Sequence, residues 1–356
     1  MSKMDLQEFT HRIFSIENPS GFNQLALEAF GFQREHCAVY RDYLKLTGKE
    51  DFIPSTVEQI PFLPIRLFKS CNVVSDWEDP AFPSEKTTVF TSSATTGMVP
   101  SHHEVKDIRL YERSFSEAFR LFYGESGSYN LLALLPSYLE RKGSSLVYMA
   151  DKLISSAKAN GREGGFFLYD HDNLLDNVRR LNGRTILLGV SFALLDFALF
   201  VKEQIPDQAM RKDMFRNVTL METGGMKGRG QELSRKELHG RLREGLCTES
   251  IHSEYGMCEL LSQAYSFDDN GVFFTPPWMK VMTRDLQDPF RILCKENVQG
   301  GINIIDLANI HSCCFIETED CGKVVPGNGK KSVHQPFTVD GRISNTERRG
   351  CNMLIE

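Results

Sequence analysis

The strongest candidate for chemistry in this sequence is a run of small and hydroxyl-bearing residues directly after an expected strand at 87–90. The run reads Thr91-Ser92-Ser93-Ala94-Thr95-Thr96-Gly97. Small residues let the backbone come close to phosphate oxygens, while hydroxyl and amide N–H groups supply hydrogen-bond donors. The spacing is not that of a P-loop, and a plain polar surface loop is the alternative interpretation. The run therefore predicts a loop that could bind the phosphates of a nucleotide.

A second candidate segment, residues 253–259, follows an expected strand at 250–252 and joins an aromatic ring, a glycine and two carboxylates. The ring of Tyr255 could stack on a base, and the carboxylate of Glu259 could hold Mg²⁺ beside phosphates. The alternative interpretation is a strand-to-helix turn with a buried tyrosine and a solvated glutamate.

A third segment, residues 317–322, reads Glu-Thr-Glu-Asp-Cys-Gly. We expect a turn that presents acidic groups, which could accept hydrogen bonds from ribose hydroxyls. A solvated acidic turn without a ligand is the alternative.

In this order, and with Gly341-Arg342 after them, the three segments resemble the motifs of the adenylate-forming enzymes, the superfamily of acyl-CoA synthetases, adenylation domains and luciferases. The first resembles the superfamily's Ser/Thr/Gly phosphate loop, the second its Tyr-Gly-x-Thr-Glu motif and the third its Thr-Gly-Asp motif. Two positions depart from the usual pattern: Ala94 stands where the superfamily usually has Gly, and Cys258 where it usually has Thr.

A closer resemblance, over most of the chain, is to the acyl-protein synthetases of bacterial bioluminescence, the LuxE-type long-chain-fatty-acid protein ligases. The segments that carry it are TSSATTG, LLPSYLERKGSSLVYM at 134–149, METGGMKGRG at 221–230, SEYGMCELLSQAY at 253–265 and the ending GR...RRGC.

The resemblance implies a site for ATP, Mg²⁺ and an acyl group. Glu259 would ligate Mg²⁺ and Asp320 would hold the ribose, with Asp306 as a competing candidate, while Arg342 would join the catalytic set. The other implied positions are Thr91, Ser92, Ser93, Thr95, Thr96 and Gly97 at the phosphates, Gly224, Gly225, Tyr255, Gly256 and Met257 around the nucleotide, and Tyr138, Leu139 and Ser145 in the acyl site.

Cys351 is a candidate acceptor for the activated acyl group. It follows Arg348, Arg349 and Gly350, so neighbouring cations favour the thiolate, and the glycine near the end of the sequence permits movement. A thiolate that attacks an acyl-adenylate forms a thioester while AMP leaves. The resemblance also implies an acylated near-terminal cysteine, whereas an inert small hydrophobe is the alternative.

Charge and hydropathy argue against nucleic-acid and membrane-spanning classes. Forty-one Lys plus Arg against forty-seven Asp plus Glu give a net charge of -6, and no long basic run could neutralise a row of phosphates. The start of the sequence lacks the apolar core of a secretory signal. The most apolar stretch, 185–201, is short for a membrane span and contains Asp196.

The cysteines predict free thiols in a reducing cytoplasm. Nine cysteines at irregular spacing form an odd set, which is not typical of a disulfide framework. His311, Cys313, Cys314 and Cys321 lack the paired spacing of common zinc sites, so we expect no metal there.

The elements that must position these residues predict an α/β fold. Residues 1–85 read as a helical cap region. In 86–270, β-rich runs alternate with amphipathic helices, which favours a largely parallel sheet. Short strands in 271–340 predict an antiparallel β-subdomain, and 341–356 form a tail that carries Cys351. The resemblance implies the large N-terminal-type domain of adenylate-forming enzymes, without their mobile C-terminal lid domain.

The expected activity is ATP-dependent conversion of a carboxylic acid, by resemblance a long-chain fatty acid, into an acyl-adenylate, followed by transfer to Cys351. The resemblance implies delivery to an acyl reductase, in a complex with an acyltransferase. Two alternatives remain open: a ligase of the phenylacetate-CoA type that releases acyl-CoA, and a non-catalytic nucleotide-binding or scaffolding subunit.

Overall fold

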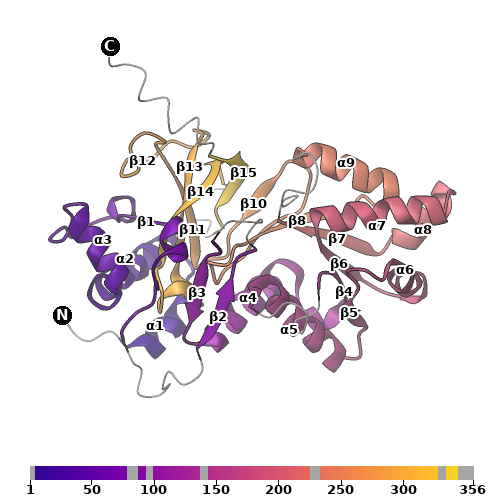
Figure 1. The fold of residues 1–356 in the computed structure, drawn as a ribbon, viewed down its shortest axis with the longest axis horizontal. Coiled ribbons are helices and arrows are strands. Elements are labelled where there is room, and N and C mark those ends of the chain that lie inside the picture. Colours follow the sequence, from indigo (N-terminus) through magenta and orange to yellow (C-terminus); the bar gives the residue numbers. More distant parts are fainter. Residues whose placement is uncertain are drawn as a thin grey trace, which may run out of the picture.

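The computed structural model is built around one mixed sheet that runs across the molecule (Figure 1). Its strand order is β12-β11-β13-β14-β15-β10-β9-β8-β7-β6-β4-β5, and β1 pairs with β14 outside this path. The structure describes residues 5–77, 87–93, 99–136, 143–224, 233–327 and 334–343.

One half of the sheet is parallel, as the alternation of strands and helices predicts. Its strands are β4 (Asn130–Leu134), β5 (Gly164–Phe166), β6 (Thr185–Val190), β7 (Val218–Thr223) and β8 (Ile251–Tyr255). β4 and β6 are buried along their whole length, because helices cover both faces of this half. The parallel order places the carboxyl ends of these strands along one edge.

Two helical layers cover the parallel half (Figure 1). One layer holds α4 (Ile108–Tyr123) and α5 (Ser145–Ala159). The opposite layer holds α6 (His171–Arg180), α7 (Ser191–Gln204), α8 (Gln208–Phe215) and α9 (Arg235–Leu246).

Helices α5 and α9 each begin at an N-cap serine. The hydroxyl of Ser144 accepts a hydrogen bond from the backbone N–H of Val147. Ser234 and Glu237 form a reciprocal capping box at the start of α9. Such caps satisfy backbone N–H groups that the first turn leaves without partners, so each helix begins at a defined residue.

The other half of the sheet is antiparallel. Its strands are β9 (Ala264–Ser266), β10 (Val272–Phe274), β11 (Met279–Arg284), β12 (Ile292–Leu293), β13 (Gly300–Asp306), β14 (Phe315–Val324) and β15 (Pro336–Arg342). β1 (Leu63–Pro64) adds to β14 in parallel. A separate hairpin consists of β2 (Thr88–Thr91) and β3 (His102–Val105).

The acidic segment 317–322 lies inside β14, where the sequence predicts a turn. Its backbone pairs with β13 on one side and β15 on the other. The register shifts between Cys321 and Gly322, and a Cβ on Gly322 would lie 2.0 Å from the carbonyl oxygen of Thr338. Only glycine fits at this irregularity, which changes the course of the strand just after Asp320.

The N-terminal helices pack on the antiparallel half (Figure 1). They are α1 (Leu6–Ile13), α2 (Pro19–His36) and α3 (Ala38–Leu46). The buried amide of Gln33 donates to the carbonyls of Asn309 and Ile310 and accepts from the N–H of Cys314. Short 3-10 helices complete the described chain: η1 (Val57–Gln59), η2 (Ile65–Lys69), η3 (Ser126–Ser128) and η4 (Leu307–Asn309).

The buried apolar side chains form one continuous core that joins the helices to both halves of the sheet. None of the described helices combines the length and the apolar character needed to cross a bilayer. Every cysteine in the described ranges is a free thiol, in agreement with the sequence-based prediction.

Candidate functional site

A cavity of about 710 Å³ lies where the two halves of the sheet meet. It is bordered by residues at or just beyond the carboxyl ends of β4, β6, β7 and β8, by the β2–β3 hairpin, and by side chains of η2 and β14. Open α/β sheets commonly bind ligands beyond the carboxyl ends of their strands. The volume falls in the range that small-molecule sites occupy.

The cavity brings together many residues that the sequence analysis named, although they come from distant parts of the chain. The named residues in its wall are Thr91, Ser92, Ser93, Ser145, Gly224, Gly256, Met257, Glu259, Asp320 and Arg342. The remaining named positions, except Tyr255 and Asp306, lie outside the described residues: Thr95, Thr96, Gly97, Gly225, Tyr138, Leu139 and Cys351, together with Ala94.

The described part of the hydroxyl-rich run is fixed by backbone contacts. The N–H of Ser92 donates to the carbonyl of Ser101, and the N–H of Ser101 donates to the hydroxyl of Ser92 at 2.8 Å. The N–H of Thr91 donates to the carbonyl of Gly143 at 2.6 Å. These contacts hold the side chains of the run at the cavity wall, where hydroxyls can meet anionic oxygens.

Glu259 places a nearly buried carboxyl in the same wall, with an exposed fraction of 5%. Burial raises its pKa, while a hydrogen bond with Ser101 and the charges of Lys69 and Arg342 oppose that rise. Its backbone carbonyl accepts from the amide of Asn309 at 2.7 Å. Mg²⁺ in nucleotide sites is usually held by one or two carboxylates together with phosphates, so this carboxyl beside a hydroxyl-rich wall fits a magnesium–nucleotide complex.

Asp320 reaches the cavity from β14, and Tyr255 lies behind it. The hydroxyl of Tyr255 donates to Asp320 at 2.8 Å, and its ring packs against Phe273 and Phe337 on the antiparallel strands. Tyr255 is not part of the cavity wall. The guanidinium of Arg342 lies 4.0 Å from Asp320 and is mostly exposed.

Asp306, the competing carboxylate, is fully buried and does not line the cavity. It accepts hydrogen bonds from the N–H of Leu261, from the N–H and hydroxyl of Ser262, and from the N–H of Ala308. Burial raises its pKa to about 6. Its oxygens are therefore occupied within the protein, whereas Asp320 faces the cavity.

Glu254 is a wall residue that the motif assignment left without a role. Strand alternation turns it to the opposite face of β8 from Tyr255. It is buried, the hydroxyl of Thr223 donates to it, and burial raises its pKa to about 7. A Cβ on Gly256 would lie 2.4 Å from its carboxylate oxygen, so the glycine makes room for this carboxyl.

Glu254 should make the stability of the protein depend on pH. Its pKa is raised from 4.5 to about 7 in the folded state, so folding favours the protonated form. Its contribution to the free energy of unfolding is fully present below pH 4.5. This contribution is lost as pH rises through 7, by about 3 kcal/mol in total. Glu254→Gln should remove this loss, so the variant gains stability relative to wild type between pH 5 and 8, as urea unfolding at each pH would measure. If the difference in unfolding free energy between Glu254→Gln and wild type stayed constant from pH 5 to 8, the raised pKa of Glu254 would be contradicted.

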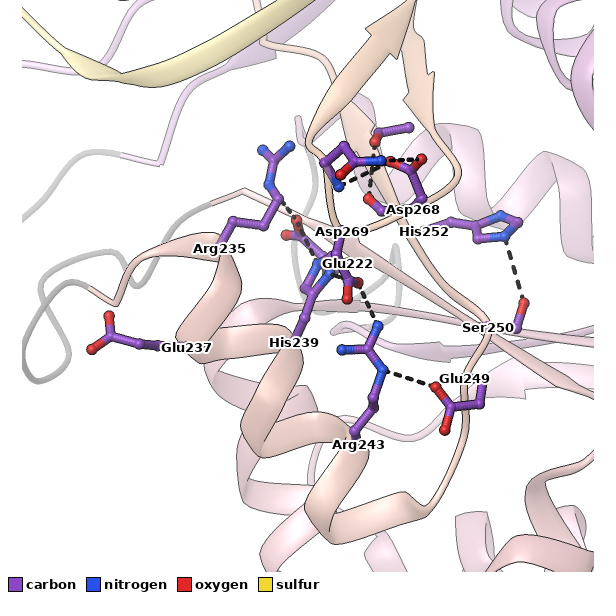
Figure 2. A network of polar contacts seen from close by, with 12 residues as sticks. Glu222, Arg235, Glu237, His239, Arg243, Glu249, Ser250, His252, Asp268 and Asp269 are labelled. Atoms are coloured by element: carbon purple, nitrogen blue, oxygen red, sulfur yellow. Dashed lines mark hydrogen bonds and ion pairs between the residues drawn. The ribbon is translucent and has the colours of Figure 1, made fainter.

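A polar network fastens α9 to the end of β7 (Figure 2). Arg235 and His239 of α9 approach Glu222 of β7 at 3.9 and 3.8 Å. His239 and Arg243 also contact Asp269. These contacts hold the last residues of β7 before Gly224 in register with the first turns of α9.

One side of the cavity is apolar. It is formed by side chains at or beyond the ends of β4, β5 and β6 and at the start of α5, and its members are Leu135, Pro136, Leu146, Val147, Met149, Leu168, Val190 and Phe192. This lobe can take the hydrocarbon part of a ligand whose polar end lies near the hydroxyl-rich wall.

Comparison with known proteins supports the fold. No family model and no curated protein matches the chain. Among solved structures, a multidomain structure with adenylation, ketoreductase and pseudo Asub domains from a keto acid-selecting NRPS module is similar, with a TM-score of 0.50 and 16% identity over 72% of this chain and 24% of that one. The likeness shows a shared fold, in agreement with the α/β fold class that the sequence predicts.

Two further structures are similar at lower TM-scores. O-succinylbenzoate coenzyme A synthetase from Bacillus subtilis, solved with ATP and magnesium ion, has a TM-score of 0.48 and 15% identity over 73% of this chain and 51% of that one. An amide bond synthetase from Marinactinospora thermotolerans has a TM-score of 0.44 and 14% identity over 64% and 44%. The chain spans about half the length of these two structures, and less of the multidomain one.

Proposed function

We propose that this protein activates a carboxylic acid with ATP as an acyl-adenylate and then accepts the acyl group on Cys351. The observation that carries the first half is the cavity itself. Three segments that resemble the adenylate-forming motifs lie far apart in the sequence, yet Ser92, Glu259 and Asp320 line the same space. A nucleotide bound there has hydroxyls for its phosphates and a carboxylate for its ribose.

In the first half-reaction a carboxylate oxygen of the acid attacks the α-phosphorus of ATP. The bond from the α-phosphorus to the bridging oxygen of the β-phosphate breaks, and pyrophosphate leaves with that oxygen. Ser92 and Ser101 orient the phosphates, and Asp320 accepts hydrogen bonds from the ribose. Mg²⁺, held at Glu259 when bound, neutralises phosphate charge. Such chemistry needs mainly positioning and charge stabilisation.

In the second half-reaction the thiolate of Cys351 attacks the carbonyl carbon of the acyl-adenylate. The bond from that carbon to the phosphate oxygen breaks, so AMP leaves with the electron pair and a thioester remains. The flanking Arg348 and Arg349 favour the thiolate. The resemblance to acyl-protein synthetases supports this acceptor.

A long-chain fatty acid is the proposed substrate. The apolar lobe of the cavity, next to Ser145, suits a hydrocarbon chain. By the same resemblance, the thioester would be handed to an acyl reductase in the cytoplasm, in a complex that includes an acyltransferase.

Intact-protein mass spectrometry tests the proposal. Wild type and Cys351→Ser are incubated with ATP, Mg²⁺ and a panel of fatty acids. We expect an acyl-sized mass gain that hydroxylamine removes and that Cys351→Ser lacks, while acid-dependent pyrophosphate release persists in the variant. Free acyl-CoA formed by Cys351→Ser with coenzyme A would instead indicate a ligase of the phenylacetate-CoA type. ATP binding without pyrophosphate release from any acid would indicate a non-catalytic subunit.

A further inference from the structure

The cavity contains a cation that none of the motifs names. Lys69, the last residue of η2, lies in the wall together with Ser92, Ser101 and Glu259. Among the described wall residues the other cation is Arg342, whose side chain has an exposed fraction of 83%. The same wall holds the acidic side chains Glu254, Glu259, Glu319 and Asp320. An anionic triphosphate chain in this space therefore needs positive charge from Lys69 more than from any other described position.

The segment before Lys69 is fixed at both ends. β1 pairs with β14, the strand that carries Asp320. Phe68 is fully buried and packs edge-on against the ring of His103, whose Nδ1 is 2.8 Å from the carbonyl oxygen of Cys258. The backbone next to Lys69 is thus tied to the residue that precedes Glu259. The contacts of the residues before it therefore position the backbone of Lys69 at the cavity wall.

The ammonium of Lys69 has no hydrogen bond or ion pair with any described residue, and its side chain is only partly buried. Lys69 and Glu259 nevertheless line the same cavity. The ammonium therefore keeps its three N–H donors for a ligand in the space that the carboxylate also borders.

We propose that Lys69 is a catalytic residue that donates hydrogen bonds to the phosphate oxygens of ATP and stabilises the charge that develops there as pyrophosphate leaves. The assignment rests on the proposed function, and it adds a cation supplied by the N-terminal region. No proton is transferred: the ammonium stays charged, and its contribution is electrostatic. A compact ammonium on a flexible stem is suited to this role.

Nucleotide binding and turnover of Lys69→Met test the inference, with Arg66→Met as the matched control. Methionine keeps the apolar stem and removes the charge. Arg66 is on the same 3-10 helix, but it lines a separate cavity beside Arg284 and Glu317. Binding of ATP and of adenosine is measured by calorimetry without acid, and pyrophosphate release is measured with acid.

For Lys69→Met we expect a loss of ATP affinity of about 30-fold and a loss of pyrophosphate release of about 100-fold. Adenosine affinity and the melting temperature should stay as in wild type, Lys69→Arg should recover part of the release, and Arg66→Met should behave as wild type.

Two results would overturn the role of Lys69. One is ATP affinity and release within threefold of wild type. The other is an equal loss for ATP and adenosine, which would indicate a structural role. A failure of the proposed function is recognised separately, because wild type would then release no pyrophosphate with any acid. The ratio of ATP affinity to adenosine affinity would still show whether Lys69 contacts phosphate. A wild type that binds no ATP would contradict both the role of Lys69 and the proposed function.

Discussion

Replacement of Glu259 by glutamine is expected to lower acid-dependent pyrophosphate release roughly 1,000-fold, without weakening the fold. The carboxyl is 5% exposed and lies beside Ser101 in the cavity wall. Glutamine keeps the shape and one acceptor oxygen, but it removes the negative charge that a magnesium–nucleotide complex would meet. Because burial raises the pKa of Glu259, the ionised carboxylate costs folding energy in the absence of metal, and the neutral amide should be at least as stable at pH 8.

The measurement is pyrophosphate release over a titration of Mg²⁺, with thermal unfolding of the same samples. Glu104→Gln is the control. Glu104 belongs to β3 of the β2–β3 hairpin, which borders the cavity, but it is not part of the cavity wall. We expect excess Mg²⁺ to recover part of the activity of Glu259→Gln. Activity within threefold of wild type at every Mg²⁺ concentration would show that Glu259 does not hold the metal.

The parallel half of the fold could be predicted from local sequence. β4 and β6 are apolar runs, and helices separate successive parallel strands along the chain. Gly224 follows β7 and Gly256 follows β8. Since parallel strands end at one edge, the order of the motifs alone predicts that these residues approach each other. The structure places both in the cavity wall.

The third motif shows where local composition is insufficient. Glycine and several acidic residues in 317–322 are typical of a turn, yet this segment is the middle of β14. Its strand conformation comes from pairing with β13 and β15, and strand formation depends on such partners more than on intrinsic preference.

Lys69 could not be predicted from the sequence because nothing in its own segment resembles a motif. It follows Pro61 and Pro64 in a stretch that reads as irregular. Its place in the same cavity wall as Glu259 depends on the pairing of β1 with β14 and on the packing of Phe68 against His103. These are contacts between residues that are far apart in the chain.

The same change, Asp to Asn, at positions 306 and 320 is expected to give opposite results. In Asp306 each carboxylate oxygen accepts two hydrogen bonds, from four donors in total. Asparagine would turn one acceptor into an amide group that faces donors, so Asp306→Asn should lose about 4 kcal/mol of unfolding free energy. Asp320→Asn keeps an acceptor for the hydroxyl of Tyr255, and its fold should persist.

Asp320→Asn should instead lose ATP affinity, by about 10- to 100-fold, because one oxygen that could accept from a ribose hydroxyl becomes a donor. Urea unfolding and calorimetry with ATP on both variants separate the two effects. A well-folded Asp306→Asn that fails to bind ATP would transfer the ribose role to Asp306. An Asp320→Asn that binds ATP as tightly as wild type would remove β14 from the nucleotide site. Only the side chain that faces the cavity should matter for the ligand, and only the enclosed one for the fold, because a carboxylate whose oxygens are already filled by backbone and hydroxyl donors has no acceptor left for a substrate.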